Sequence, residues 1–407
     1  MSSSRNSHRE QRTGIASRSG LSAVRAAAGT RRPMLLAIGV VVAIAAIGGY
    51  FLVATKPKPA SHSTAGSHAK SQSGANGGGA QQQTGQSSEP TVSITWVGDM
   101  TFGTLNAWPP NGTGSLLDSV KQDLHSNLTV GNLETVLGDL PSSKCSAGEK
   151  DCYEFEAPDS TAADLKEDGF SAVNVANNHT LDAGTAGVTS TDDALRAAHL
   201  KWTGRPGQIT YLRKNGIKIA LLGFAPWSYD ADALDIPAAE SLVREAKQHA
   251  QIVIVLEHLG AEGNTAQHVS AGEEYFLGQD RGNSIAFTHG VIDAGADLVM
   301  GSGPHVLRGM QWYHGHLIAY SLGNFCGYNT LSVNGVSSTS AILHITLNAH
   351  GQFVRGNITP LTLVSPGTPE PDPAKAAIGV INSLSRADFD GNGAVHISAR
   401  GRLARPR

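Results

Sequence analysis

Charge of either sign is scarce in this 407-residue chain, and the part that looks folded holds no dense run of basic residues. Charged residues make up 16% of the sequence, and the formal net charge is −3 at pH 7. Because so balanced a composition gives no case for nucleic-acid binding, we expect no nucleic-acid partner. A long basic groove for an anionic polymer is not evident in the sequence either.

Residues 1–90 lack the pattern of a folded domain and divide into three segments. Residues 1–33 are rich in arginine, serine and alanine, with Glu10 as the single acidic residue, and are predicted to form a disordered basic tail. Residues 34–54 contain no charge and are long enough to cross a hydrocarbon core of about 30 Å as a helix. Residues 55–90 are low in complexity and are predicted to be a flexible linker.

The arginines before the apolar segment predict its orientation in a membrane. Basic residues on the amino-terminal side favour a cytoplasmic amino terminus, with everything after the span exported. We therefore expect a single-pass plasma-membrane protein whose folded domain is extracytoplasmic. A cleaved signal peptide is the alternative, but its apolar region is usually shorter and is followed by a small-residue cleavage site, which is not evident here. Thr30–Arg32 also loosely resembles a twin-arginine signal.

Cysteine is equally scarce, with only 3 in the chain. Cys145 and Cys152 flank a polar stretch that is typical of a surface loop, and their spacing does not fit a CxxC-type metal knuckle. In an exported domain these two are expected to form a disulfide. Cys326 follows a strongly apolar stretch and is predicted to be a buried free thiol.

Short apolar runs alternate with helical stretches from residue 91 to about residue 326, which predicts an α/β fold with largely parallel strands. After them, residues 341–347 and 352–363 flank a turn and predict two antiparallel strands. We expect one folded domain over residues 91–407. The expected strands before the antiparallel pair are 92–97, 128–130, 172–175, 217–224, 252–256, 298–300 and 317–320, and the expected helices include 160–167, 190–198, 238–250 and 283–293.

Near the carboxyl terminus, the stretch Asp388–Gly393 matches the opening of a calcium-binding loop. Ala399 occupies the position where such a loop requires a bidentate glutamate. We therefore interpret Asp390–Gly393 as a hairpin turn between Phe389 and residues 395–397.

Polar side chains and glycines follow the expected strands at the points where the strands end. Ligands bind in open α/β sheets at the carboxyl ends of the strands, so these side chains are expected to form one site. Carboxylate, amide and imidazole donors suit one or two divalent ions such as Mn²⁺, Mg²⁺, Fe or Zn²⁺, and the lack of a thiolate argues against structural zinc. The candidates are Asp99, Glu134, Asn177, Asn178, His179, Asp182, His258, Glu262, His305 and Asn324.

The stretch Asn177–His179 is the centre of this pattern. An asparagine can give a neutral oxygen ligand to a cation, and a neighbouring histidine can carry a proton. A polar turn and helix cap is the alternative interpretation, because asparagine and aspartate often occupy turns.

Taken together, these motifs resemble the CapA family of poly-γ-glutamate and capsule synthesis proteins. The resemblance covers about residues 92–326 and implies a fold similar to that of calcineurin-like metallophosphatases, a four-layer α/β/β/α sandwich. The motifs are Gly98-Asp99, Asn132-Leu133-Glu134, Ala176–Gly184, Gly295–Val306 and Tyr320–Phe325.

The resemblance also implies roles for single residues. Asp99 corresponds to a metal ligand on the first strand, and Glu134 to an acidic ligand that can bridge two ions. Asn178 corresponds to a ligand and His179 to the proton donor beside it, the catalytic residue. His258 and His305 correspond to later ligands. Supporting positions in the site are Asn177, Asp182, Glu262 and Asn324.

Two positions depart from the family pattern. Leu259 stands where the family usually has tryptophan, and Gly303 stands where it usually has the first histidine of His-Pro-His. An imidazole ligand is therefore missing. The candidates to replace it are Ser302, His289, His314 and His316.

Three functions remain open from the sequence. The first is a metal-dependent hydrolase of a phosphoester or another linkage in an envelope polymer. The second is a non-catalytic factor that binds an anionic polymer resembling poly-γ-glutamate during export, together with a polymer synthase complex. The third is a scaffold whose metal site has decayed.

Overall fold

The computed structural model describes residues 89–406, apart from residues 106, 141–142, 147–148 and 151. The predicted tail 1–33, the predicted span 34–54 and the predicted linker up to residue 88 lie outside the described residues. Among the helices that are described, none is long and apolar enough to cross a membrane.

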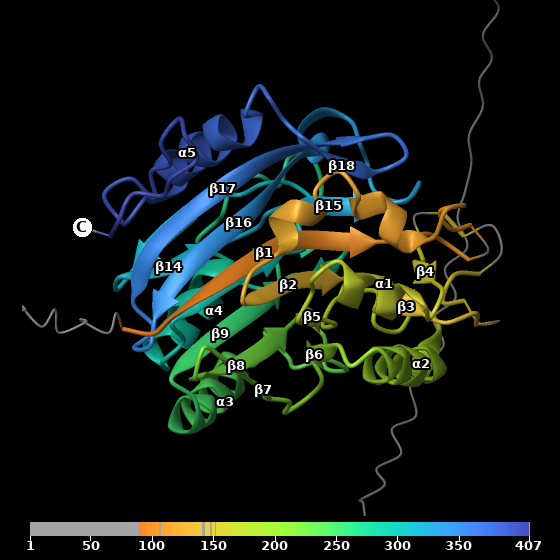
Figure 1. Cartoon of the computed structure of the whole chain (residues 1–407), viewed down its shortest axis with the longest axis horizontal. Coiled ribbons are helices and arrows are strands. Elements are labelled where there is room, and N and C mark those ends of the chain that lie inside the picture. The colour runs from red at the N-terminus through yellow and green to blue at the C-terminus, as the bar shows by residue number, and fades with distance from the viewer. Residues whose placement is uncertain (1–88, 106, 141–142, 147–148, 151, 407) are drawn as a thin grey trace, which may run out of the picture. The chain divides into compact units, whose positions relative to one another are not determined.

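A mixed eight-stranded sheet forms one half of the domain (Figure 1). Its order is β18-β17-β16-β1-β2-β5-β6, and β15 pairs with the carboxyl-terminal part of β1. β1, β2, β5 and β6 run parallel, whereas β16, β17 and β18 are antiparallel to their neighbours. The strands are β1 (Thr91–Thr101), β2 (Leu128–Leu133), β5 (Ala172–Asn174), β6 (Lys201–Thr203), β15 (Asn324–Gly327), β16 (Thr339–Asn348), β17 (Phe353–Val364) and β18 (Thr368–Pro371).

A six-stranded sheet forms the other half, in the order β13-β14-β12-β9-β8-β7. Its four central strands, β14, β12, β9 and β8, are parallel, and β13 and β7 are antiparallel edge strands. The strands are β7 (Thr210–Lys214), β8 (Ile217–Phe224), β9 (Ile252–His258), β12 (Leu298–Ser302), β13 (Met310–Tyr313) and β14 (His316–Ala319).

Helices and two short strand pairs, one parallel and one antiparallel, complete the described part of the chain. The α-helices are α1 (Thr161–Glu167), α2 (Gly184–Ala197), α3 (Ile236–His249), α4 (Ser284–Asp293) and α5 (Ala376–Phe389). The short 3₁₀ helices are η1 (Thr113–Leu117), η2 (Lys121–Leu124) and η3 (Gly335–Ser338). The two-stranded sheets pair β3 (Val136–Leu137) with β4 (Glu156–Ala157) and β10 (Tyr275–Phe276) with β11 (Gln279–Asp280).

The two large sheets pack face to face, and helices cover their outer faces. Alternate strand residues point to opposite faces, so Trp96 of β1 packs between the sheets with Leu256 of β9. Val97, one position further along β1, belongs to the cluster that α1 and α2 cover. On the other sheet, Leu222 of β8 packs against Val243 of α3. This arrangement confirms the expected α/β/β/α order.

The strand and helix pattern of the sequence is confirmed over most of the domain. Residues 341–347 and 352–363 form the antiparallel pair β16–β17 as predicted. Cys326 is a buried free thiol, also as predicted.

Asp390–Gly393 forms a turn, as predicted, but the interpretation of it as the turn of a hairpin is wrong because a helix precedes it. Residues up to Phe389 belong to α5, and a turn follows the helix. The apolar face of α5 packs against β13, β16 and β17, with Ile381 buried in the core between the sheets. Because this tertiary contact stabilises the helix, the local Asp-Gly-Asn-Gly sequence only terminates it.

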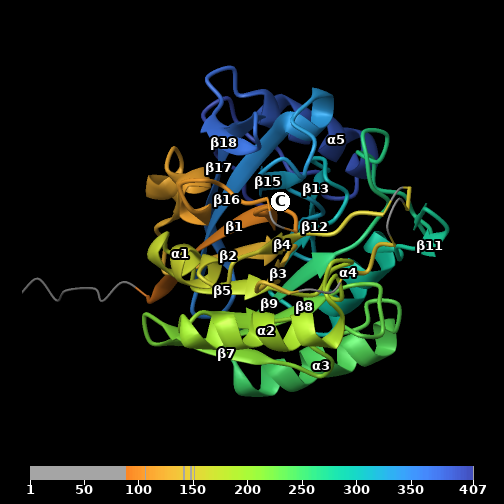
Figure 2. The same ribbon diagram turned by 90° about the vertical axis from the view of Figure 1, so that its right-hand side faces the viewer.

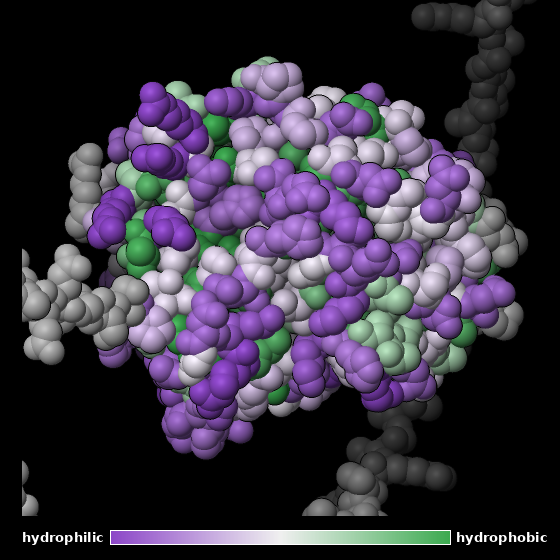
Figure 3. Space-filling model, in the orientation of Figure 1, coloured by the Kyte–Doolittle hydropathy of each residue, from purple (hydrophilic) through white to green (hydrophobic). Residues whose placement is uncertain are grey.

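The parallel strands of both sheets end on the same side of the domain. β1 and β2 run to the right in Figure 1, so Figure 2 looks onto their carboxyl ends. The indole nitrogen of Trp96 donates a hydrogen bond to the carbonyl oxygen of Gly301 at 3.2 Å and links the two sheets near this edge. Figure 3 shows that the face of the domain seen in Figure 1 is mostly hydrophilic, with small apolar areas between polar side chains.

Candidate metal centre

The carboxyl ends of four parallel strands bring the main candidate residues together. Asp99 lies in β1, Glu134 follows β2, His258 is the last residue of β9, and His305 follows β12. Asp99 pairs in register with Asn132 of β2, and His258 pairs with Ser302 of β12. Residues that are far apart in the sequence therefore share one site, because parallel strands end at one edge.

The donor atoms of the site lie at distances that suit a shared cation. One ligand atom each from Asp99, Glu134 and His258 fall within 4.8 Å of one another, and all three residues are buried. Oε1 of Glu134 lies 3.7 Å from Nε2 of His258 and 3.6 Å from Nε2 of His305. Oδ2 of Asp99 lies 3.3 Å from Nδ1 of His305.

Several buried polar atoms of this cluster have no hydrogen-bond partner among the described residues. They are both carboxylate oxygens of Glu134, Nε2 of His258 and Oδ1 of Asn178. Buried polar atoms are nearly always hydrogen bonded, so unpaired ones need an explanation. Oxygen and imidazole donors together fit Mn²⁺, Mg²⁺, Fe or Zn²⁺. The residues present therefore fit a divalent ion.

Burial and mutual charge shift the pKa values of these groups in opposite directions. Burial raises the pKa of Glu134 well above its ordinary value, although the charge of His305 opposes the shift. Burial would also raise the pKa of Asp99, but hydrogen bonds with His258 and His305 hold it below its usual range. For His305, burial is outweighed by the charge of Glu134 and by the contact with Asp99, which raise its pKa well above the ordinary value. Glu134 and His305 therefore favour a proton held between them, whereas Asp99 stays ionised.

His179 lies beside the cluster and is held by Asp182. Its Nδ1 atom lies 2.7 Å from Oδ2 of Asp182, and its Nε2 atom lies 3.8 Å from Oε1 of Glu134. The ring stacks on Phe155, with centroids 4.1 Å apart. Burial lowers the pKa of His179, while the carboxylate of Asp182 opposes the shift. The geometry directs Nε2 of His179 toward the candidate metal centre.

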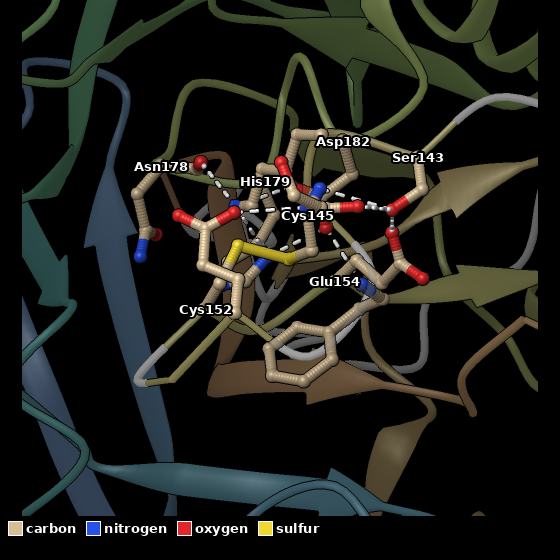
Figure 4. The surroundings of a disulfide bond; sticks show 11 residues. Ser143, Cys145, Cys152, Glu154, Asn178, His179 and Asp182 are labelled. Atoms are coloured by element: carbon tan, nitrogen blue, oxygen red, sulfur yellow. Dashed lines mark hydrogen bonds and ion pairs between the residues drawn. A yellow bond between two sulfur atoms is a disulfide. The ribbon is translucent and has the colours of Figure 1, made fainter.

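A loop closed by the Cys145–Cys152 disulfide covers the side of this histidine (Figure 4). The Cα atoms of the two cysteines are 5.7 Å apart. Nζ of Lys144 lies 2.5 Å from Oδ1 of Asp182 and donates to the carbonyl oxygen of Asn178 at 3.3 Å. The backbone amide of Phe155 donates to Oδ2 of Asp182 at 2.6 Å. Residues that flank the disulfide on either side therefore fix the carboxylate that orients His179.

Asn132 is a functional position that the sequence-based candidate set left out. Its Nδ2 atom donates to Oδ1 of Asp99 at 2.8 Å and lies 3.1 Å from Nδ1 of His258. Its Oδ1 atom accepts a hydrogen bond from Asn174 at 3.0 Å. Asn132 therefore orients two candidate ligands. Its position two residues before Glu134, at the end of the same strand, could have identified it from the sequence.

The supporting candidates orient the site from its rim. Asn177 donates from its side chain to the carbonyl oxygen of Leu133 at 2.9 Å and accepts from the backbone amide of His179 at 3.0 Å, which fixes the turn. Oδ1 of Asn324 lies 2.9 Å from Nδ1 of His305.

Glu262 links the cluster to an arginine that the sequence did not single out. The side-chain amide of Asn178 donates to Oε1 of Glu262 at 3.4 Å, and Oε2 of Glu262 lies 3.7 Å from Nε2 of His305. Nη1 of Arg281 lies 2.5 Å from Oε1 of Glu262. The guanidinium group packs over the ring of Trp227 at 5.0 Å. No sequence motif pointed to Arg281, because only the folded chain brings it to Glu262.

Gly303 occupies the position of the missing histidine. Its φ of 110° lies in a region that residues with a side chain rarely adopt. Its backbone amide donates to Oδ2 of Asp99 at 3.2 Å, so the residue supports the site through its main chain.

The proposed replacements for that histidine have other partners. His289 lies 2.8 Å from Oε1 of Gln311, His314 pairs with Asp293, and His316 contacts the carbonyl oxygen of Asp297. The hydroxyl of Ser302 lies 3.3 Å from Nδ1 of His258 and also contacts the carbonyl oxygen of Glu257. Among the described residues, no imidazole replaces the missing one, and the site gathers one compact set of donors.

The cluster opens into a cleft of about 780 Å³. Tyr153, directly after Cys152, contributes to one wall, and the β10–β11 segment contributes Leu277 to another. Both side chains are exposed, by 62% and 64% respectively. The site is therefore accessible to a ligand that can contact apolar surface on both sides of the cleft.

The protein is an α/β protein with two stacked sheets. At one edge of these sheets, buried carboxylate, amide and imidazole donors form a candidate divalent-metal centre. The family model described as "Bacterial capsule synthesis protein PGA_cap" matches residues 93–329, and the chain belongs to this family. The resemblance to the CapA proteins is thereby confirmed.

Individual proteins resemble the chain over most of the folded domain. The "PGA biosynthesis protein CapA" of Bacillus subtilis (strain 168) is 28% identical over 304 residues, covering 70% of this chain and 74% of that protein. The "Capsule biosynthesis protein CapA" of Bacillus anthracis is 28% identical over 309 residues and 69% of each chain. Among solved structures, a 5'-nucleotidase precursor from Thermus thermophilus has a TM-score of 0.35 at 14% identity, with 73% of this chain and 59% of that chain covered.

Proposed function

We propose that this protein acts in the synthesis or export of a capsule or poly-γ-glutamate-like envelope polymer, as a metal-dependent hydrolase of phosphoester bonds. The observation that carries the catalytic part is the set of buried, unpaired donor atoms on Glu134, His258 and Asn178. The names of the Bacillus relatives support the cellular process. A phosphoester, or an envelope polymer that contains one, is the proposed substrate class.

Asp99, Glu134, Asn178, His258 and His305 would hold the divalent ion. When bound, such an ion supplies a Lewis acid for a phosphoryl group and activates water near neutral pH. Asn132 and Gly303 keep Asp99 oriented through hydrogen bonds at 2.8 and 3.2 Å.

His179 supplies the proton that a departing oxygen needs. Its Nδ1–H is engaged by Asp182, so the second proton of the imidazolium form lies on Nε2, the atom that faces the cluster, and this is the proton available for transfer. Lys144 and Phe155 hold Asp182, and stacking on Phe155 keeps the ring in place. General acid catalysis from a positioned histidine contributes a factor of about 10² to 10⁴.

The test is to compare the purified full chain with its His179→Asn variant. We expect bound Mn²⁺ or a similar ion in both proteins and hydrolysis of bis-p-nitrophenyl phosphate that falls by about 10² to 10⁴ in the variant. Metal content would be measured by mass spectrometry. Equal hydrolysis by the two proteins would contradict the role of His179, and the absence of any ion would contradict the metal-dependent chemistry.

A second candidate function is a non-catalytic polymer-binding or export factor. The observation that favours it is Gly303, since the missing imidazole leaves a smaller donor set. A chain that retained its role in envelope-polymer production after His179→Asn would support this function instead.

The proposed location follows from the sequence alone. We place the chain in the plasma membrane through residues 34–54, with the folded domain outside the cytoplasm and within reach of a polymer synthase complex. An alkaline phosphatase fused after residue 90 should be active if this orientation is right, and an inactive fusion would contradict it.

A further inference from the structure

A second hollow lies over the outer face of the eight-stranded sheet, away from the metal centre. Its volume is about 660 Å³, and it shares no lining residue with the cleft at the metal centre. Its floor consists of outward-facing residues of β1, β16 and β17. Ser93, Thr346 and Arg355 pair across the three strands in one row, and Thr95, His344 and Asn357 pair in the next.

Basic side chains from distant parts of the sequence line this hollow. Arg355 comes from β17, Arg402 and Arg405 come from the carboxyl-terminal segment, and His125 and His344 add two imidazoles. The carboxyl-terminal segment is held there by backbone contacts, including the bridge between Asn357 and Arg402. No carboxylate is among the described residues that line the hollow.

The three arginines have no acidic partner within the described part of the chain. None of them takes part in an ion pair there, and all three are exposed. The guanidinium group of Arg405 donates to the backbone carbonyl of Val354 at 3.0 Å, which directs it along β17. Figure 3 shows strongly hydrophilic side chains gathered at the left of this face, where β17 and the chain's carboxyl end lie. Unpaired positive charge in a concave surface attracts anions.

We propose that this hollow, lined by Arg355, Arg402 and Arg405, binds a segment of an extended polycarboxylate chain. The planar guanidinium group binds a carboxylate through two parallel hydrogen bonds, and three such groups can bind successive carboxylates. The half-buried side-chain amide of Asn357 on the floor supplies a neutral hydrogen bond to a polymer backbone. The choice of polymer rests on the proposed role in envelope-polymer synthesis, whereas the site lies outside the cleft and is separate from the proposed hydrolase activity.

The geometry favours a polycarboxylate over a single-stranded nucleic acid or an anionic membrane. Nucleic-acid strands bind on aromatic platforms, and the one phenylalanine among the lining residues, Phe353, is packed edge-on against Trp312 at 4.9 Å. A lipid surface is flat, whereas these arginines surround a hollow with a polar floor.

The test is the binding of fluorescently labelled poly-γ-glutamate of defined length to the full chain, followed by anisotropy at low salt. We expect the triple variant Arg355→Gln, Arg402→Gln, Arg405→Gln to bind the polymer roughly 10-fold to 100-fold more weakly. Each exposed ion pair between an arginine and a carboxylate of the polymer contributes modestly to the binding free energy, and the variant loses three of them. The matched control is Lys166→Gln, Lys201→Gln, Arg386→Gln, which removes the same charge from exposed sites outside the hollow and should change the affinity by less than about twofold.

Each other outcome would overturn the proposal. Equal weakening in the two triple variants would mean that net charge, and not this hollow, attracts the polymer. Tighter, arginine-dependent binding of an oligodeoxynucleotide or of phosphatidylglycerol vesicles would assign the hollow to a different partner. The single variant Arg355→Gln repeats the test at an exposed position, should the triple variant fail to fold. Phosphoester hydrolysis by the arginine variants should stay unchanged, so this result is independent of the proposed activity.

Discussion

Glu134 is the residue whose surroundings say most about the site. Its side chain is fully buried, and neither oxygen has a hydrogen-bond partner in the described part of the chain. A buried carboxylate without hydrogen bonds is costly, so a folded protein keeps one only where something compensates. A cation shared with Asp99 and His258 would do so, which makes Glu134 the most direct reporter on the metal centre.

Replacing Glu134 by glutamine should stabilise the metal-free protein and abolish stabilisation by metal. Because burial raises the pKa of this carboxyl group, the metal-free wild type loses stability as pH rises from the unfolded-state pKa through the higher folded-state pKa. Glu134→Gln removes that loss, and we expect its free energy of unfolding at neutral pH to be higher by roughly 1–3 kcal/mol. Urea unfolding with and without Mn²⁺ measures both effects. Metal stabilisation of equal size in the two proteins would rule out Glu134 as a ligand.

Metal binding should release protons and strengthen as pH rises. The charge of Glu134 raises the pKa of His305, and burial raises the pKa of Glu134, so this pair holds a proton that a bound ion must displace. Calorimetry of Mn²⁺ binding in buffers of different ionisation enthalpy counts the protons that are released. An affinity that does not change between acidic and neutral pH would contradict this account.

At the scale of single elements, the close packing of β1 against the segment that leads into β15 sets the position of Asp99. A Cβ atom at Gly98 would lie 1.9 Å from the carbonyl oxygen of Gly323, which belongs to the main chain and cannot move aside cheaply. The next residue, Asp99, donates its backbone N–H to the same carbonyl oxygen at 3.0 Å. The glycine thus allows the strand end to approach its neighbour.

The variant Gly98→Ala should therefore lower both stability and metal affinity. We expect a loss of about 1–3 kcal/mol in the free energy of unfolding, as for other overpacked interiors. Gly272→Ala is the matched control, because no atom lies within 4 Å of the Cβ position there. Thermal unfolding and Mn²⁺ titration measure the two effects. A Gly98→Ala protein as stable as the control would show that this close approach is not needed.

The disulfide loop is the element that holds the proposed proton donor. Replacing Cys145 and Cys152 by serine should destabilise the folded state by about 2–3 kcal/mol, as expected for a short closed loop. It should also lower hydrolysis, because Lys144 and Phe155 no longer fix Asp182. Reductant should reproduce the loss in the wild type and in Cys326→Ala, which lacks the free thiol. Unchanged hydrolysis in the double serine variant would contradict the loop's role.

The strands and the residues at their ends could be predicted from sequence, because both follow local rules. Apolar runs form strands, and Asp99, Glu134 and His258 stand where those runs end. Asn132 and Arg281 were not singled out, since their roles depend on contacts across the fold. The basic hollow was not evident for the same reason: Arg355 and Arg402 are distant in the sequence and meet only through the pairing of β17 with the carboxyl-terminal segment.

At the scale of the whole molecule, the eight-stranded sheet links two distinct surfaces. β1 carries Asp99 to the metal centre at its carboxyl-terminal end, and its residues 93–95 line the basic hollow nearer its start. A protein with this arrangement can bind one part of an anionic polymer while another ligand occupies the cleft. Membership of the capsule synthesis family agrees with such a role.

Anomalous diffraction from crystals of the protein grown with Mn²⁺ would locate the ion. We expect one strong anomalous peak in contact with Asp99, Glu134 and His258, with His179 beside it and held by Asp182. If Mn²⁺ fully occupied other sites in the crystal and no peak lay between Glu134 and His258, the proposed metal centre would be wrong.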